Sequence, residues 1–485
     1  MVESKKNENT EIIIQSMVLP NEICDEKELY FRIQKPGALL QKEDSLILEK
    51  NAIISTNTYM NCFDIQAWTQ YTGITTYKLV IEAQGKGHIT LYSLDTNMPI
   101  AKCSIDTDTP QKYSIEFQEI GSAHLVYFEV KSEETLCITK ASYIAICKEE
   151  TVNTIHFDLL ICTYKRRDEV RALLKQIRQS LFFDKSSSLY GALTIRIIDN
   201  ASELDTKNDE HVKIYHNPNT GGSGGFTRGI LESRKELEKH KTSHVIFMDD
   251  DVQMINETLY RLYALLLLAT KEYQHRVIAG RMFRMDKKNI QYTACEVWNG
   301  GDIRHIGENQ DMCQVKHLKQ MNHELGEYTG WWFGCFPIDF VNKELPLPFF
   351  LHCDDVDYGL RFGKEPLVMN GIQVWHETFE NRLSPTIIYY DIRNSLIVNT
   401  IHGYFVNEQN AWNWWKQRLW SFYGYIAMLD YLKGKAFFEK YQEKKQLMQM
   451  NKLVFRILKP FLWRFLWFRF KREGSRAFES YKMQL

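Results

Sequence analysis

The sequence predicts an α/β protein whose central sheet of buried strands is preceded by a β-sandwich and followed by a helical region. Three observations lead to this fold class. The N-terminal part contains short alternating segments rich in Val, Ile, Thr and Tyr, the centre alternates buried strands with amphipathic helices, and the C-terminal part is helical and aromatic. We therefore expect domains at residues 1–150, 151–382 and 383–485.

Length and composition exclude several classes of protein. The chain has 485 residues, 44% of them hydrophobic, which is too long for one ordinary core and too apolar for a disordered or fibrous protein. The 60 Lys and Arg balance 61 Asp and Glu, so no global field attracts nucleic acid, and we expect no nucleic-acid partner.

The cysteines and the apolar runs indicate a cytoplasmic protein. Ten cysteines are scattered without a CxxC pair, which predicts reduced thiols and excludes zinc-finger spacing. No apolar run follows the lysines near the N-terminus, so we expect no signal peptide. The aliphatic stretch 263–269 is far shorter than the roughly 20 residues that a spanning helix needs, so we expect no transmembrane segment.

The N-terminal region is predicted to be an antiparallel β-sandwich. Residues 76–83, 88–94 and 123–130 alternate or run apolar, and Gly- or Asp-containing clusters separate them. Such modules bind carbohydrate or position a neighbouring domain, and we favour the positioning role.

The central region is predicted to form a parallel sheet from the apolar runs 156–164, 193–200 and 244–251, with a helix near 166–178. In such sheets a ligand lies beyond the carboxyl ends of the strands. The polar residues at those ends define the candidate site: Thr163 to Arg167, Asp199 to Ser202 and Asp249 to Asp251.

Three aspartates end the third of these strands. Because side chains alternate along a strand, Asp249 and Asp251 are expected to face one ligand while Asp250 faces the other way. Two carboxylates on one side suit Mg²⁺ or Mn²⁺, which in turn could hold a diphosphate. The alternative is a solvated turn or a helix N-cap.

A glycine-rich segment, NPNTGGSGGFTRG, occupies residues 217–229. Four glycines within the five positions 221–225 allow a backbone to approach a ligand closely. A helix predicted to start near Phe226 would direct amide groups and Arg228 at an anion. The segment lacks the Lys-Ser/Thr of a P-loop and the spacing of GxGxxG, which disfavours an ATPase or a Rossmann dehydrogenase. The alternative is a flexible loop.

The segment HCDDVDYGLR at 352–361 contains the next candidates. A carboxylate here could act as a general base, and the neighbouring Asp354 and Asp355 would point about 100° apart on a helix and have separate roles. The competing interpretation is a helix N-terminus with acidic residues in its first turn.

One histidine and two tryptophans complete the set. His376 ends a short predicted strand at 371–377 and could be a third metal ligand, although a single histidine is more often structural. Trp331 and Trp332 lie in a Gly-flanked segment, where their indole faces could stack on a sugar or pack in the core.

The ordered set of motifs resembles a known family more specifically than any single member does. The motifs, in chain order, are ICTYKR (161–166), IIDNAS (197–202), NTGGSGGFTRG (219–229), DDD (249–251), GWWFGCFP (330–337), HCDDVDYGLR (352–361) and VWHE (374–377). They resemble the inverting family 2 glycosyltransferases with a GT-A fold, a Rossmann-like mixed sheet, and most of all the bacterial galactofuranosyltransferases of the mycobacterial galactan type. Those enzymes also have an N-terminal β-sandwich and a C-terminal helical region.

The resemblance implies a role for each matching residue. Asp249, Asp251 and His376 would hold Mn²⁺ or Mg²⁺ at the diphosphate. Asp355 would remove the proton of the acceptor hydroxyl, with Asp354 supporting the site, and Trp331 and Trp332 would border the acceptor. The donor-binding residues would be Arg166, Asn200, Asn219, Gly224, Gly225, Arg228 and Asp250.

The implied function is transfer of galactofuranose from UDP-galactofuranose to a lipid-linked glycan or polysaccharide of a cell wall or capsule. The same chemistry with a rhamnosyl or glucosyl donor is a close alternative. A noncatalytic glycan-binding scaffold is an alternative of another class, but a binder needs neither the DDD motif and His376 nor Asp355. The sequence leaves the oligomeric state open, with a homo-oligomer as one alternative.

The C-terminal region contains an aromatic helix at 412–425, then a Lys-, Glu- and Gln-rich helix, then a basic tail. Residues 452–476 carry eight cations and one glutamate, a net charge of +7, interleaved with Phe and Trp. This mixture suits a helix lying on an anionic membrane, so we expect peripheral association with the inner face of the plasma membrane. Pro460 is expected to kink the helix. A solvated helix and a nucleic-acid patch are the alternatives.

Overall fold

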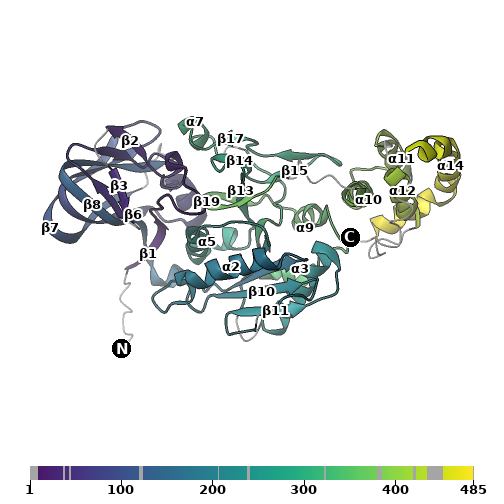
Figure 1. The fold of residues 1–485 in the computed structure, drawn as a ribbon, viewed down its shortest axis with the longest axis horizontal. Helices are drawn as coiled ribbons and strands as arrows, with labels where there is room; N and C mark the ends of the chain where they lie inside the picture. The colour runs from purple at the N-terminus through teal and green to yellow at the C-terminus, as the bar shows by residue number, and fades with distance from the viewer. Residues whose placement is uncertain are drawn as a thin grey trace, which may run out of the picture.

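The computed structural model describes residues 9–35, 39–42, 45–118, 124–205, 207–237, 241–321, 324–378, 385–418, 422–433 and 452–483. The molecule is elongated, with a β-rich N-terminal region at one end, an α/β region in the centre and C-terminal helices at the other end (Figure 1). The predicted fold class is confirmed. The ten cysteines are unpaired, as the sequence predicted.

Eight strands of the described N-terminal region form one hydrogen-bonded network, with helix α1 (Ile65–Thr72) beside them. The strands are β1 (Asn9–Ser16), β2 (Arg32–Lys35), β3 (Leu39–Lys42), β4 (Ser45–Leu48), β5 (Ile53–Ser55), β6 (Thr76–Ser93), β7 (Pro99–Gln118) and β8 (Val126–Lys148). β8 lies between β6 on one side and, in succession, β5, β4 and β1 on the other.

The strands β6, β7 and β8 are longer than the sequence predicted. Residues 76–83 and 88–94 were expected to be separate strands, but both belong to β6, with a register shift between Ala83 and Gly85. A Cβ at Gly85 would lie 2.1 Å from the carbonyl oxygen of Thr135, so the glycine permits a close strand contact rather than a chain reversal.

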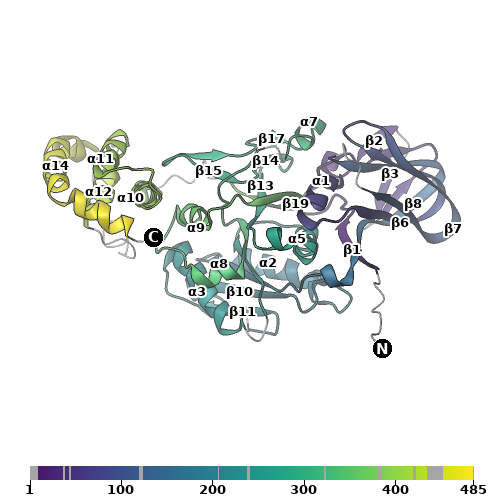
Figure 2. The same cartoon turned by 180° about the vertical axis from the view of Figure 1, so that it is seen from behind.

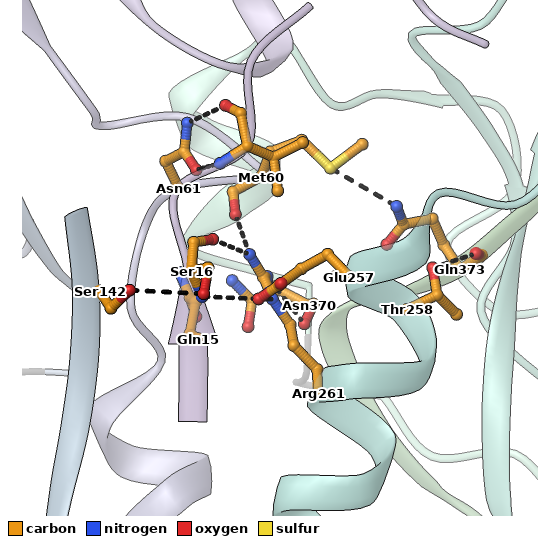
Figure 3. A network of polar contacts seen from close by, with 12 residues as sticks. Gln15, Ser16, Met60, Asn61, Ser142, Glu257, Thr258, Arg261, Asn370 and Gln373 are labelled. Carbon is orange, nitrogen blue, oxygen red and sulfur yellow. Dashed lines mark hydrogen bonds and ion pairs between the residues drawn. The ribbon is translucent and has the colours of Figure 1, made fainter. Parts of the chain in front are cut away.

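A polar network joins this region to the central one (Figure 3). Arg261 of α5 (Asn256–Leu268) donates to the carbonyl oxygen of Met60 at 2.6 Å, and Glu257 accepts from the backbone N–H of Ser16 at 2.6 Å. Arg261 is fully buried and fits because residue 371 is a glycine, where a Cβ would lie 1.8 Å from the guanidinium. The two regions are thus held together by buried, charge-assisted hydrogen bonds.

The central region contains a nine-stranded mixed sheet in the order β11-β10-β9-β12-β18-β13-β14-β17, with β19 paired to β13. Its strands are β9 (Phe157–Thr163), β10 (Leu193–Asp199), β11 (Val212–His216), β12 (His244–Asp249), β13 (Ile278–Arg284), β14 (Ile290–Thr293), β17 (Gln310–Asp311), β18 (Phe333–Pro337) and β19 (Leu367–His376). A separate hairpin consists of β15 (Glu296–Trp298) and β16 (Ile303–His305).

The three strands predicted in this region are present and mutually parallel, in the order β10-β9-β12. Two further strands were not predicted: the short edge strand β11, and β18, which runs antiparallel to β12. Because the chain leaves β9 for β10 on one side and β12 lies on the other, the switch point of the sheet falls between the carboxyl ends of β9 and β12.

Helices cover this sheet and position its loops. They are α2 (Arg167–Gln179), α3 (Gly221–Lys235), α5, α6 (Lys271–Gln274), α7 (Val315–Leu318), α8 (Ile338–Lys343) and α9 (Asp354–Phe362). In the two opposite views, α2 and α3 run along the layer of β10 and β11, and α9 lies between the sheet and the C-terminal helices (Figures 1 and 2).

The C-terminal region packs α10 (Pro385–Ile401), α11 (Glu408–Gln417), α12 (Phe422–Lys433) and α14 (Lys452–Lys482) around the buried Trp412 and Trp415. Helix α14 continues through Pro460. Most of the predicted Lys-, Glu- and Gln-rich helix lies outside the described residues. Over the described ranges, no helix combines the length and the apolar character needed to cross a membrane.

Candidate active site

Two strand ends bring three potential metal ligands together. Asp249 is the last residue of β12, Asp251 follows it in the turn, and His376 is the last residue of β19. His376 Nε2 lies 2.9 Å from Asp251 Oδ1 and 3.6 Å from Asp249 Oδ2, and the three ligand atoms all lie within 4.8 Å of one another. A backbone bridge between Gln253 and Trp375 fixes this approach, since it joins the segment after β12 to β19.

The donor set fits a divalent cation. Two carboxylates and one imidazole, converging from a sheet edge, are ligands that Mn²⁺ accepts, and Mg²⁺ accepts the carboxylates. His376 is fully buried, so its ring is held in place by packing as well as by Asp251. The predicted cluster of Asp249, Asp251 and His376 is therefore present in the fold.

Arg166, at the end of β9, lies against the same carboxylates. Its Nη1 lies 3.3 Å from Asp250 Oδ1 and forms an ion pair with Asp251 Oδ2. Burial alone would raise the pKa of the Asp251 carboxyl, but His376 and Arg166 outweigh burial and hold that pKa well below its ordinary value. Asp251 is thus held ionised by its two basic neighbours.

Asp250 differs from its two neighbours. Its side chain is buried, and burial raises the pKa of this carboxyl to about 7 despite a hydrogen bond from Thr163 and the charge of Arg166. Asp250 therefore lies against Thr163 and shares Arg166 with Asp251. Asp250 and Asp251 follow β12 in a turn, so the strand alternation used in the sequence prediction does not apply to them.

The second acidic pair begins helix α9. Asp354 and Asp355 are its first two residues, and the backbone N–H of Val356 donates to Asp355 Oδ1 at 2.8 Å. Burial, with the charges of Asp354 and Glu296, raises the pKa of the Asp355 carboxyl well above its ordinary value. Burial, opposed by backbone hydrogen bonds, raises that of Asp354 to about 7. A carboxyl with a raised pKa is suited to accepting a proton.

Glu296 near this pair was missed in the sequence. It is buried, its carboxylate lies 2.8 Å from His305 Nδ1, and its backbone pairs with Tyr328. A Cβ at Gly359 of α9 would lie 2.4 Å from Tyr328 Cβ, so α9 packs directly on this tyrosine. Glu296 sits in an ordinary strand-like segment, and only the fold reveals its proximity to Asp355.

The glycine-rich segment is helical from Gly221, five residues earlier than predicted. Gly221 and Gly225 are buried, and a Cβ at Gly225 would lie 2.2 Å from Cys162 Sγ in β9. Gly222 and Gly224 are partly exposed in the first turn of α3, and a Cβ at Gly222 would lie 3.4 Å from Asp354. The glycines therefore bring the start of α3 close to β9 and α9, and the predicted start near Phe226 is wrong.

This earlier start changes the expectation for Arg228. The residue lies two turns into α3, where its Nε donates to Glu232 Oε1 at 2.7 Å and its guanidinium lies over the ring of Tyr215 in β11. At 1.5 Å per residue, Arg228 is about 10 Å from the helix start. Arg228 therefore lies away from the first backbone amides of α3, and the expectation that both face one anion is wrong.

The two asparagines expected around the donor shape the entry to α3. Asn200 is buried; it donates to the carbonyl oxygen of Gly221 at 3.0 Å and accepts from Asn217 at 2.8 Å. Asn219 is exposed, and its Oδ1 accepts from the backbone N–H of Gly221 at 3.1 Å. Asn200 thus fixes the loop, and Asn219 remains available to a ligand.

The structure corrects the placement of the two tryptophans. Trp331 is 5% exposed and packs among Phe226, Phe247 and Tyr358. Trp332 is 3% exposed and donates through Nε1 to the carbonyl oxygen of Gly280 at 2.9 Å. Both indole faces are covered by the core, so neither stacks on an acceptor sugar in this arrangement, and the acceptor-binding prediction for them is wrong.

Comparisons with known families agree with this architecture. Residues 158–320 match the model of glycosyl transferase family 2, and residues 14–146 match that of the galactofuranosyltransferase 2 N-terminal domain. Residues 158–320 thus contain a glycosyl transferase family 2 domain, and residues 14–146 are similar to the N-terminal domain of galactofuranosyltransferase 2. The class predicted from the ordered motifs is confirmed.

Two curated relatives are similar over most of the chain. The galactofuranosyltransferase GlfT2 of Mycobacterium tuberculosis is 22% identical over 79% of this chain and 64% of its own length. GlfT2 of Mycolicibacterium smegmatis is 22% identical over 79% of this chain and 63% of its own. The chain thus spans less than two thirds of the length of these relatives.

A solved structure of the mannosyltransferase PcManGT from Pyrobaculum calidifontis, in complex with GDP-Man and Mn²⁺, is also similar. Its TM-score is 0.33 and its sequence identity 11%, over 52% of this chain and 64% of that one.

Proposed function

We propose that this protein is an inverting, metal-dependent galactofuranosyltransferase that takes galactofuranose from UDP-galactofuranose to a lipid-linked glycan or polysaccharide. One observation carries the proposal: the Asp249, Asp251 and His376 cluster lies at the switch edge of a family 2 domain, and the acidic start of α9 is near it. The galactofuranosyltransferase 2 N-terminal match and the names of the two relatives support galactofuranose as the sugar.

The metal side would hold the departing nucleoside diphosphate. Asp249, Asp251 and His376 would bind Mn²⁺ or Mg²⁺, which when bound neutralises charge on the leaving phosphates. Arg166 is half-buried beside Asp251, so its guanidinium adds positive charge at the same edge. The exposed Asn219 and the first turn of α3 contribute amide donors that suit phosphate or sugar oxygens.

The acidic side would activate the acceptor. Asp355, ionised when the acceptor binds, would take the proton of the incoming hydroxyl, and the oxygen would attack the anomeric carbon opposite the diphosphate. One displacement inverts the configuration, so no covalent glycosyl-enzyme forms. Asp354, which precedes Asp355 in α9 and lies beside Gly222 in the first turn of α3, would support this geometry.

A panel of nucleotide sugars tests the proposal directly. With Mn²⁺ and a synthetic galactofuranosyl lipid acceptor, we expect transfer from UDP-galactofuranose and little from rhamnosyl or glucosyl nucleotides. Excess EDTA should abolish transfer, and Mn²⁺ should restore it. Preference for another donor would support the proposed reaction but show that galactofuranose is not the transferred sugar. If no donor were either transferred or hydrolysed, the result would favour a glycan-binding scaffold.

We also propose that α14 holds the enzyme at the cytoplasmic face of an anionic membrane. Phe461, Phe465 and Phe468 are 52% to 68% exposed, and their spacing of four and three residues places them on one face of the helix. The exposed cations Arg464 and Lys471 belong to the same stretch of α14. Exposed aromatic rings with nearby cations are suited to the interface of a bilayer with negative headgroups.

Vesicle binding tests this location. Replacing Phe461, Phe465 and Phe468 together by Ser should lower co-sedimentation with phosphatidylglycerol vesicles about tenfold or more, since each ring loses its apolar burial. Replacing the exposed Met98 and Val406 by Ser is the matched control and should change nothing. Equal partitioning of the triple variant and the parent protein would reject the proposal.

A further inference from the structure

The loop that leads into α9 has an unusual backbone. We call residues 349–353 the base loop, because Asp354 and Asp355 follow it directly. Within it Phe350 has φ 75°, His352 has φ 64° and Cys353 has φ 64°. These left-handed conformations are disfavoured for residues with side chains. Three such residues among positions 350–353 therefore need contacts from surrounding segments to hold the backbone in this shape.

Helix α10 of the C-terminal region supplies part of that constraint. Asn394 is fully buried, and its Nδ2 donates to three carbonyl oxygens of the base loop: Leu351 at 2.6 Å, His352 at 2.8 Å and Phe349 at 3.3 Å. One amide group therefore satisfies carbonyls that the irregular backbone cannot pair with itself. All three of these acceptors lie in the base loop and outside α10.

Arg393, the preceding residue, orients Asn394. Its Nε donates to Asn394 Oδ1 at 2.8 Å, which leaves the amide nitrogen facing the loop, and its Nη2 donates to the carbonyl oxygen of Phe349 at 2.7 Å. The guanidinium is buried and lies over the rings of Tyr389 and Tyr390, at 5.6 and 4.8 Å from their centroids. The aromatic contacts hold the arginine in place.

Helix α3 holds the base loop on another side. The backbone N–H of Phe350 donates to Ser223 Oγ at 2.8 Å. Gly221 lies so close that a Cβ there would be 1.9 Å from the carbonyl oxygen of Phe350. The base loop is thus fixed between the glycine-rich start of α3, which lies on the donor side, and the α10 pair.

We propose that Arg393 and Asn394 are positioning residues for Asp355: they keep the base loop in its left-handed conformation and thereby set where the carboxylate meets the acceptor hydroxyl. The inference rests on the proposed function, since it assigns Asp355 the proton. It gives the C-terminal helices a part in catalysis besides any contact with a membrane. Neither residue touches the reacting atoms; both act through the loop backbone.

Asn394→Ala tests this role against a matched control. Asn399 lies on the same helix, is fully buried, and bonds to Gly300 and Trp298 instead of the base loop. We expect both alanine variants to lower the melting temperature. Asn394→Ala alone should lower kcat by about 10- to 100-fold, as a misplaced reactive group does, while the dissociation constant for UDP with Mn²⁺ stays unchanged.

A second-site variant separates positioning from folding. Cys353→Gly allows φ 64° without a side-chain penalty, so the Asn394→Ala/Cys353→Gly protein should regain part of the lost kcat. Amide hydrogen exchange at residues 350–353 should rise in Asn394→Ala and not in Asn399→Ala.

The outcomes separate the two proposals. Equal kcat losses in the two alanine variants, or no recovery on adding Cys353→Gly, would overturn the positioning role. If the parent protein transfers no sugar, the proposed function fails, whereas the exchange measurement still tests whether Asn394 holds the loop.

Discussion

The two halves of the candidate site are constructed differently. The metal cluster stands at the ends of two strands, β12 and β19, and the backbone bridge between Gln253 and Trp375 accompanies the 2.9 Å approach of Asp251 to His376. The acidic pair follows a loop with three left-handed residues, held by side chains from α3 and α10. One half inherits its geometry from the sheet, while the other depends on contacts between distant segments.

This difference indicates where each half is vulnerable. A strand end is fixed by many backbone hydrogen bonds, so a substitution there removes a metal ligand without moving the backbone of the sheet. The base loop is fixed by few groups, so a substitution at a distance can displace a carboxylate. Variants of both halves should therefore fail in different ways, the first in metal binding and the second in turnover.

The largest effect is expected at Asp355. Asp355→Asn keeps the shape of the side chain and removes its ability to take a proton, so transfer should slow by about 10²- to 10⁴-fold. Donor binding, measured by titration with UDP and Mn²⁺, should remain, because the ligand cluster is intact. A variant with the turnover of the parent protein would show that another group is the base.

A smaller effect is expected at the metal side. His376→Ala should raise the Mn²⁺ concentration needed for half-maximal transfer by about tenfold or more, and excess Mn²⁺ should recover part of the rate. His156→Ala is the control, since this buried histidine precedes β9 at the opposite end of the sheet. If both variants respond alike to Mn²⁺, the cluster does not bind the ion.

The pH dependence should report the acidic half. Burial and neighbouring carboxylates raise the pKa of Asp355, and only its ionised form accepts a proton, so kcat/KM should fall as pH decreases through this raised value. Asp354→Asn removes one neighbouring charge and should move the acid limb to lower pH. A pH–rate profile at saturating Mn²⁺ measures the shift, and an unmoved limb would mean that the two carboxyls are not coupled.

The smallest effect concerns the helix between the two halves. Gly225→Ala places a methyl group 2.2 Å from Cys162 Sγ, and we expect a loss of about 1–3 kcal/mol through overpacking of α3 on β9. Gly222→Ala on the same turn finds only an ordinary contact at 3.4 Å and should not be destabilising. Thermal unfolding compares the two, and equal melting temperatures would contradict the close packing.

Sequence patterns predicted those parts of the site that follow from one element. The apolar run before Asp249 identified β12, and the same reasoning located β9 and β10. Sequence patterns did not decide the position of residues whose type is common both at binding surfaces and in the core. Trp331 and Trp332 suited stacking and core equally well, and they are in the core. Side chains of α3, β12 and α9 surround Trp331, and Trp332 bonds to the backbone of β13.

Other residues gave no signal that a single sequence could reveal. Glu296 sits in an unremarkable segment and approaches Asp355 only because the β15–β16 hairpin packs near α9. Arg393 and Asn394 did offer a hint, as adjacent polar residues in a helix, 385–401, that is rich in Ile, Leu, Val and Tyr. Buried polar side chains need partners, but the sequence could not show that the partners are carbonyls of the base loop.

The sequence by itself determined the class of protein through its ordered motifs, and the three central strands through their apolar periodicity, because both are local properties of the chain. It also predicted Asp249, Asp251 and His376 as metal ligands, and the fold brings these three side chains together. Only the tertiary structure decided the start of α3, the burial of the tryptophans and the support of Asp355. These depend on which segments pack together, and packing at close contact is set by the whole fold.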